Sequence, residues 1–240
     1  MTTGCIPPSP QDDWALFLDI DGTLVEIAPK PGAVAVPPQL SALLVAASNR
    51  LGGALALVSG RPLDSIDRLL APLKLPCSAE HGATVRYFDG TVSAPDPARR
   101  VPDAWRERVA AAAARWPGVL VENKPVGICV HFRLAPDREG EVRTLLDSLV
   151  AESADLEVLP AHKALEIRDR RLTKGEGVLA LMKSSPFAGR VPVFVGDDVT
   201  DEDGFRAARA LGGLGLRVGE VFGGAPANVR QWLKDFAGGT

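Results

Sequence analysis

The sequence predicts an α/β protein with a doubly wound, mostly parallel, Rossmann-like core and an inserted α+β domain. Short apolar runs without alternation are typical of strands buried on both faces of a parallel sheet, and here they are separated by helical stretches. One internal stretch instead alternates apolar and polar residues, as half-buried antiparallel strands do. The 240 residues, 46% of them hydrophobic, are enough for one large or two small domains with a sizeable core.

The first half of the core alternates strands and helices. Residues 15–18 and 54–58 are continuously apolar and predict buried strands, and residues 41–51 between them predict a helix. A second helix is expected to start at Pro62, because proline suits the first turn, and to run to about Leu70. This order is typical of a doubly wound sheet with right-handed crossovers.

The same alternation returns near the carboxyl end. The expected elements are strands at 191–195 and 214–218 and helices at 201–211 and 227–236. Thr200 is the expected N-cap of the first of these helices, with Glu202 and Asp203 in its first turn, where acidic side chains complement the helix dipole.

The middle of the chain has a different pattern. In residues 126–133, Ile128, Val130 and Phe132 share one face of an expected strand, and Cys129, His131 and Arg133 share the other. Helices are expected at 105–116 and 137–153, and further strands at 156–159 and 164–167. We therefore expect an inserted domain at residues 96–171, which splits a core made of residues 12–95 and 172–240.

Composition argues against several classes of protein. The 27 basic and 30 acidic residues give a net charge of −3 without a block of like charge, so no nucleic-acid partner is expected. No apolar segment approaches the roughly 18 residues of a membrane span, and residues 1–13 lack the apolar core of a secretory signal. The expectation is a cytoplasmic monomer without a membrane partner. The three cysteines and the three histidines (His81, His131 and His162) show no spacing typical of a zinc site.

An acidic segment directly follows the first expected strand. In open α/β sheets ligands bind outside the carboxyl ends of the strands, where Asp19 and Asp21 would lie. Two carboxylates on one turn can divide the work, one as nucleophile and the other in proton transfer. Gly22 permits the sharp turn. The alternative is an ordinary surface turn, since Asp-Gly is a common turn pair.

A second acidic segment, residues 196–203, follows the strand expected at 191–195. Closely spaced carboxylates repel one another unless a cation or a helix amino terminus offsets them, and hard oxygen ligands suit Mg²⁺. An acid-rich helix start would explain residues 201–203 equally well, but it would not explain Asp197 and Asp198.

Two weaker signals lie elsewhere in the core. Ser59, Gly60 and Arg61 follow the second strand, and Lys174 precedes an expected helix. Taken singly, such a serine is usually a helix cap and such a lysine is usually solvated. Together they offer a hydroxyl, a backbone amide and two cations, which suit a phosphoryl group.

In this order, the motifs at residues 19–23, 59, 174 and 196–198 resemble those of the haloacid dehalogenase-like phosphatases, and the insertion lies where that superfamily carries its cap. Five further segments, at residues 59–61, 80–83, 122–124, 130–133 and 200–202, are similar to the trehalose-6-phosphate phosphatase family. This similarity runs from Trp14 to Leu233.

The resemblance implies hydrolysis of a small phosphosugar, trehalose 6-phosphate, through an aspartyl phosphate. Its implied catalytic residues are Asp19 as nucleophile, Asp21 as acid and base, and Lys174. The implied Mg²⁺ ligands are Asp19, Asp197 and the backbone carbonyl of Asp21, with Asp198 or Asp201 orienting metal waters or Lys174. The implied substrate contacts are Ser59, Gly60 and Arg61 in the core and Glu122, Lys124 and Glu166 on strands of the cap.

Two alternatives remain open at this stage. The core motifs do not distinguish a trehalose 6-phosphate phosphatase from a capped phosphatase for another sugar or glycerate phosphate. A catalytically silent phosphosugar-binding module belongs to a different class, and the presence of both Asp19 and Asp21 argues against it.

Overall fold

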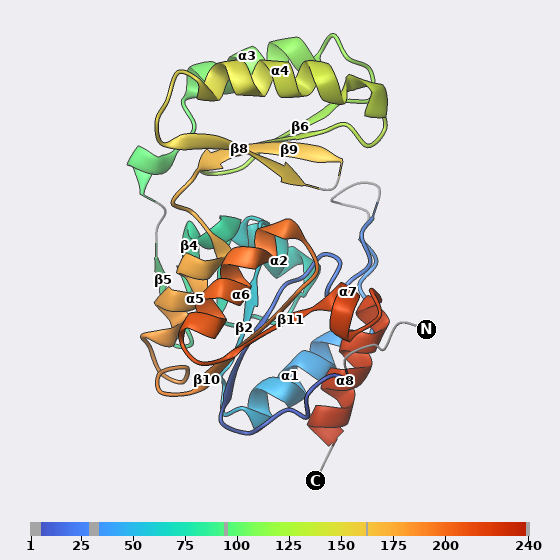
Figure 1. The fold of residues 1–240 in the computed structure, drawn as a ribbon, viewed down its shortest axis with the longest axis vertical. Helices are drawn as coiled ribbons and strands as arrows, with labels where there is room; N and C mark the ends of the chain where they lie inside the picture. The colour runs from blue at the N-terminus through green and yellow to red at the C-terminus, as the bar shows by residue number, and fades with distance from the viewer. Residues whose placement is uncertain (1–5, 29–33, 94–95, 162, 239–240) are drawn as a thin grey trace. The chain divides into compact units, whose positions relative to one another are not determined.

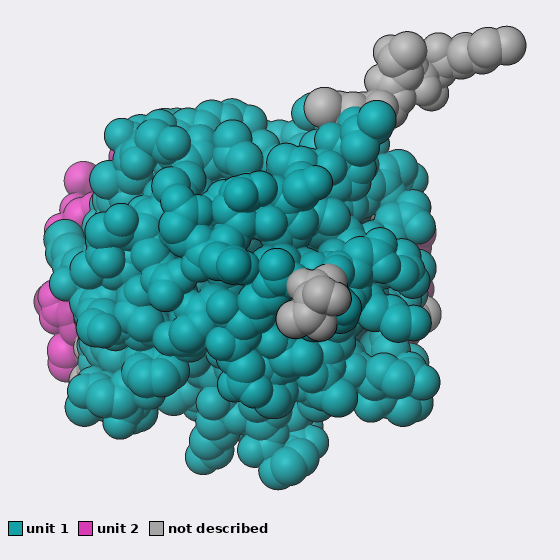
Figure 2. Space-filling view, turned by 90° about the horizontal axis from the view of Figure 1, so that it is seen from below, with its two compact units in different colours: residues 1–93, 173–240 teal, residues 94–172 magenta. Residues whose placement is uncertain are grey.

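The computed structural model describes residues 6–28, 34–93, 96–161 and 163–238. The chain forms two compact units, residues 1–93 with 173–240 and residues 94–172, which are coloured teal and magenta in Figure 2. Each unit has its own cluster of buried hydrophobic residues. None of the helices in the described ranges is long and apolar enough to cross a membrane.

The first unit is built on a seven-stranded sheet in the order β11-β10-β1-β2-β3-β4-β5. The strands from β11 to β3 are parallel, and β4 and β5 continue the sheet as antiparallel neighbours. The strands are β1 (Trp14–Leu18), β2 (Leu55–Val58), β3 (Cys77–Ala79), β4 (Thr84–Arg86), β5 (Val92–Ser93), β10 (Val191–Gly196) and β11 (Leu214–Arg217). Every residue of β1 is buried, as expected for a strand in the middle of a sheet that is covered on both faces.

Helices cover both faces of this sheet. Helices α5 and α6 pack against each other, and α1 packs against α8 on the opposite side (Figure 1). The helices are α1 (Leu40–Arg50), α2 (Leu63–Leu69), α5 (Lys174–Met182), α6 (Glu202–Ala210), α7 (Val218–Val221) and α8 (Pro226–Gly238), with 3₁₀ turns η2 (Glu80–Gly82) and η5 (Val199–Asp201). Aromatic contacts tie the helices to the strands, as where Phe205 meets Phe194 edge-on with ring centroids 5.5 Å apart.

The second unit is a four-stranded antiparallel sheet in the order β6-β7-β9-β8, with two helices packed on one face. Its elements are η3 (Pro97–Arg99), α3 (Asp103–Ala113), β6 (Leu120–Asn123), β7 (Ile128–His131), η4 (Pro136–Arg138), α4 (Glu139–Val150), β8 (Leu156–Ala161) and β9 (Ala164–Asp169). Ile128 and Val130 are buried against Val142 and Leu146 of α4, whereas the polar side chains of β7 lie on the opposite face.

The predicted fold class is confirmed, and most expected elements lie within a few residues of their observed bounds. The N-cap assigned to Thr200 is wrong. Asp198 instead caps the turn η5 in a capping box with Asp201, and helix α6 starts only at Glu202. Lys124 was expected on a strand, but it lies one residue beyond β6. His162 falls outside the described residues.

Candidate active site

Asp19 lies at the carboxyl end of the central strand β1. Its backbone N–H donates to the Val195 carbonyl oxygen at 3.0 Å, which ties it to the neighbouring strand β10. The side chain is buried, with the residue 3% exposed. Burial raises the pKa of the Asp19 carboxyl well above its usual value, although the nearby Lys174 ammonium lowers it.

Lys174 joins the two acidic segments. It is the first residue of α5, which Thr173 caps by accepting a hydrogen bond from the Glu176 N–H. Its Nζ donates to Asp19 Oδ1 at 2.8 Å and to Asp201 Oδ1 at 2.6 Å. Burial alone would lower the pKa of Lys174, but the two carboxylates outweigh burial and raise it, so the ammonium stays charged.

Asp201 and Asp198 hold the second acidic segment in shape. Asp201 Oδ2 accepts hydrogen bonds from the backbone N–H groups of Asp197 and Asp198, each at 2.9 Å. The Asp198 carboxylate accepts from the Val199 N–H at 2.7 Å. Both oxygens of Asp201 therefore already have partners, and this residue orients Lys174 and the Asp197 backbone.

The acidic residues provide a donor set that fits a divalent cation. Asp19, Asp197 and Asp201 each offer a carboxylate oxygen, and these oxygens lie within 4.8 Å of one another. Burial, followed by the Asp201 charge, raises the pKa of Asp197 to about 6. Hard carboxylate oxygens crowded in a partly buried site are the ligands that Mg²⁺ takes in proteins. The residues present therefore fit the ion implied by the resemblance.

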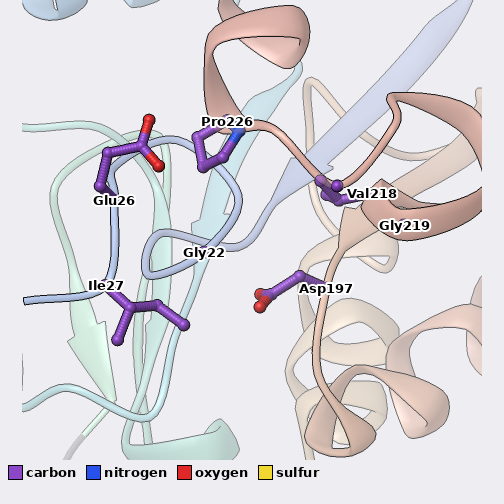
Figure 3. A pocket seen from close by; sticks show the side chains of 8 residues that line it. Gly22, Glu26, Ile27, Asp197, Val218, Gly219 and Pro226 are labelled. Atoms are coloured by element: carbon purple, nitrogen blue, oxygen red, sulfur yellow. The ribbon is translucent and has the colours of Figure 1, made fainter.

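Gly22 allows the nucleophile segment to approach Asp197. Its φ of +84° is in the left-handed region, and a Cβ at this position would overlap the Asp197 carboxylate. Both residues line a surface pocket of about 380 Å³ with Glu26, Ile27, Val218, Gly219, Gly224 and Pro226. Figure 3 shows the Asp197 carboxylate pointing towards the loop at Gly22. The pocket gives solvent access to Asp197 within the first unit.

Arg61 contacts Asp21 in this structure. Its Nε and Nη2 donate to the two carboxylate oxygens of Asp21 at 2.5 and 2.6 Å, a bidentate pair. The Arg61 N–H donates to Ser59 Oγ at 3.2 Å, and Ser59 itself is buried. The sequence suggested a phosphate or sugar contact for Arg61, and this link to Asp21 had no signal in the motif.

The predicted sugar-binding residues of the second unit lie close together on the sheet face away from the helices. Glu122 of β6 is opposite Cys129 of β7, which in turn is opposite Glu166 of β9. Lys124 Nζ donates to Glu166 Oε2 at 2.5 Å, with both side chains 7% exposed. Burial lowers the pKa of Lys124, but the charge and hydrogen bond of Glu166, together with the neighbouring Cys129 and Glu122, outweigh burial and raise this pKa to about 12.

His131 belongs to the same cluster, although the sequence analysis assigned it no role. His131 Nε2 lies 2.9 Å from Glu122 Oε2, and this hydrogen bond, as the largest cause, lowers the pKa of Glu122. The alternation of residues 126–133 had already placed His131 on the polar face of its strand. This shared face was the one sequence feature that indicated a position for His131 beside the sugar-binding residues.

These features define the class of protein. A buried aspartate directly after strand β1 of a parallel sheet, a lysine at a helix start and a second acidic segment make up the site, and the structural neighbours, among them a haloacid dehalogenase-like hydrolase from B. subtilis, share this fold. Residues 17–234 match the trehalose-phosphatase family. The chain belongs to that family.

Individual relatives agree with this assignment. A probable trehalose-phosphate phosphatase of Sinorhizobium fredii is 46% identical over 87% of this chain and 78% of its own length. The trehalose-6-phosphate phosphatase of Escherichia coli is 36% identical over 86% of this chain and 77% of its own length. A crystal structure of a trehalose-6-phosphate phosphatase related protein has a TM-score of 0.77 at 24% identity and covers 92% of this chain and 96% of that one, which shows the shared fold.

Proposed function

We propose that the protein hydrolyses trehalose 6-phosphate to trehalose and phosphate, with Mg²⁺ as cofactor and an aspartyl phosphate on Asp19 as intermediate. Membership of the trehalose-phosphatase family supports the substrate. The observation that carries the chemistry is the arrangement of Asp19, Lys174 and Asp201, in which one buried ammonium bridges two carboxylates. A cytoplasmic monomer remains part of the proposal, and size-exclusion chromatography tests the monomer.

Asp19 is the proposed nucleophile. Lys174 holds Asp19 Oδ1 at 2.8 Å, which fixes the orientation of the carboxylate towards phosphorus. Attack on the phosphoryl group splits a difficult hydrolysis into two displacements. Ser59, the Gly60 amide and Lys174 are the proposed donors to the nonbridging phosphoryl oxygens.

Asp21 is the proposed acid and base. It would protonate the departing sugar oxygen and then activate the water that cleaves the aspartyl phosphate. Arg61 holds both Asp21 oxygens in the structure through Nε and Nη2, which orients the Asp21 carboxylate.

Asp19, Asp197 and the backbone carbonyl of Asp21 are the proposed metal ligands. When bound there, Mg²⁺ would offset the negative charge between an anionic nucleophile and an anionic phosphate. Asp201 and Asp198 are assigned the support of this site, because their carboxylates accept the hydrogen bonds that orient Lys174 and the backbone of the segment.

The second unit is the proposed cap, with Glu122, Lys124 and Glu166 holding the sugar hydroxyls. Their support is the row of Glu122, Cys129 and Glu166 across β6, β7 and β9 and the buried Lys124–Glu166 pair. Such a pair fits recognition of hydroxyl groups, because its oxygens accept and its ammonium donates.

The test measures phosphate release with and without Mg²⁺ from trehalose 6-phosphate, glucose 6-phosphate, sucrose 6-phosphate and mannosyl phosphoglycerate, beside Asp19→Asn. Mg²⁺-dependent preference for trehalose 6-phosphate, lost in the variant, is the expected result. Preference for another ester would leave the catalytic roles of Asp19 and Asp21 in place but contradict the sugar-binding roles of the residues in the second unit. A lack of turnover with every ester would favour a silent binding module.

A further inference from the structure

The segment Glu80–Gly82 has an unusual backbone that the proposed chemistry does not use. Glu80 has a φ of +48° and His81 a φ of +56°, and Gly82 follows with +100°. Two successive non-glycine residues in the left-handed region are uncommon, and such strain persists only where the surroundings enforce it. Glu80 and His81 are also buried, at 3% and 5% exposure.

One side of the segment is bonded to the loop that follows β2. The Glu80 N–H donates to the Arg61 carbonyl oxygen at 3.0 Å, and the His81 N–H donates to the Ser59 carbonyl oxygen at 3.1 Å. The left-handed backbone turns both N–H groups back towards this loop. The carbonyl groups on either side of Gly60 are therefore both held by the same short segment.

The His81 ring lies directly against Gly60. A Cβ added to Gly60 would lie 2.5 Å from His81 Nε2 and 2.6 Å from His81 Cε1, closer than real Cβ contacts. The imidazole therefore fills the space that a side chain at residue 60 would need, and it lies in contact with the loop backbone at Gly60.

The other side of the segment rests on the start of helix α5. A Cβ added to Gly82 would lie 2.6 Å from the Thr173 carbonyl oxygen and 3.3 Å from the Gly177 nitrogen. Lys174 is the first residue of that helix. The segment thus lies between the loop of Ser59–Gly60–Arg61 and the helix turn that presents Lys174.

We propose that His81 is a positioning residue, which the left-handed Glu80–Gly82 segment holds against Gly60 so that the Ser59–Arg61 loop and Lys174 converge on one phosphoryl group. This inference rests on the proposed function, which assigns phosphate contacts to Ser59, Gly60 and Lys174. It deepens that function because it assigns the spacing of these donors to residues that never touch the substrate.

A double-mutant cycle tests the contact between ring and loop. Gly60→Ala should lower kcat by about 100-fold, the scale of an ångström-sized misplacement of a reacting group. His81→Ala removes the colliding ring, so the double variant should recover at least about tenfold over Gly60→Ala alone. If the loss of kcat in the double variant equals the product of the losses in the two single variants, the proposal is overturned. Gly140→Ala is the matched control and should leave kcat unchanged, since no atom lies within 4 Å of that Cβ.

A second pair of variants tests the backbone conformation. Both asparagine and valine lack the imidazole ring, but asparagine adopts the left-handed region readily and valine does not, so His81→Val should lose more of kcat than His81→Asn, with KM changing less than kcat in both. Equal kcat in the two variants at equal melting temperature would contradict the role of the left-handed backbone.

The substrate assignment can fail without affecting this test. Every variant is also assayed with p-nitrophenyl phosphate, and amide hydrogen exchange is followed at Gly60 and Arg61. In His81→Val these two amides should exchange at least about tenfold faster than in the wild type, whether or not any ester is hydrolysed. Unchanged exchange would overturn the inference, whereas hydrolysis of p-nitrophenyl phosphate but not of trehalose 6-phosphate would overturn only the proposed substrate.

Discussion

At the residue scale, Gly22 places the nucleophile segment next to Asp197. Gly22→Ala should lower kcat and raise the Mg²⁺ concentration needed for half-maximal activity, because the added Cβ displaces the Asp197 carboxylate. A Mg²⁺ titration of phosphate release measures both. Gly90→Ala is the control, since Gly90 has nearly the same φ, +85°, with no atom within 4 Å. Equal effects of the two substitutions would mean that backbone strain alone is responsible.

Arg61 is a second residue with a measurable role. Lysine cannot reproduce the two parallel hydrogen bonds that the guanidinium makes to Asp21. Arg61→Lys should therefore lower kcat about tenfold with a smaller change in KM, since one well-placed interaction is worth about that much. Steady-state kinetics with trehalose 6-phosphate distinguishes a role of Arg61 in orienting Asp21 from a role in binding the substrate. A raised KM at unchanged kcat would instead indicate that Arg61 serves substrate binding.

At the element scale, the proposed sugar-binding side chains on the sheet of β6, β7 and β9 (Glu122, Lys124 and Glu166) should determine which phosphate ester is hydrolysed. Glu166→Gln should lower kcat/KM for trehalose 6-phosphate by about 100-fold and leave p-nitrophenyl phosphate hydrolysis nearly unchanged. Loss of one charge from a buried pair also destabilises a protein by about 3–5 kcal/mol, so melting temperatures accompany the kinetics. Glu152→Gln, at an exposed ion pair, is the control. Equal losses for both esters would contradict the sugar-binding role.

The elements also show what the sequence could and could not predict. The buried strands β1, β2 and β10 were predictable because their apolar runs are continuous. The strands β3 and β4 were missed, because segments of three residues carry no usable period. Thr200 was assigned as a cap because a local rule favours threonine, but the hydrogen bonds of Asp198 and Asp201 determine the actual start.

In the site, too, the sequence predicts some features and not others. Asp19, Asp197 and Lys174 follow strands or begin a helix, so the topology of a parallel sheet predicts their convergence. Contacts that depend on side-chain reach carry no sequence signal. The Arg61 guanidinium on Asp21 and the His81 ring beneath Gly60 are of this kind.

At the scale of the whole molecule, stability should respond to Mg²⁺ and pH together. The pKa of Asp197 is raised from 3.8 to about 6 without metal, so the folded state binds more protons than the unfolded state in this interval. The carboxylate therefore lowers stability as the pH rises through that window, and Mg²⁺ should offset the loss above it. The increase in melting temperature caused by Mg²⁺ should be larger at about pH 7.5 than at about pH 5. A Mg²⁺-induced increase that does not depend on pH would contradict the assignment of Asp197 as a ligand. The Asp197→Asn variant should show no such pH-dependent increase.

The two separate hydrophobic clusters lead to a final prediction. Phe17 and Phe194 belong to the cluster of the first unit, Val130 and Leu146 belong to that of the second, and all proposed metal ligands lie in the first. Because a ligand stabilises the unit that binds it, Mg²⁺ should slow amide hydrogen exchange in β1 and β10 and leave β7 and β9 nearly unchanged. Hydrogen-exchange mass spectrometry of the full chain resolves these segments, and Asp197→Asn should remove the protection of β1 and β10. Equal protection of both units would show that they unfold as one cooperative body.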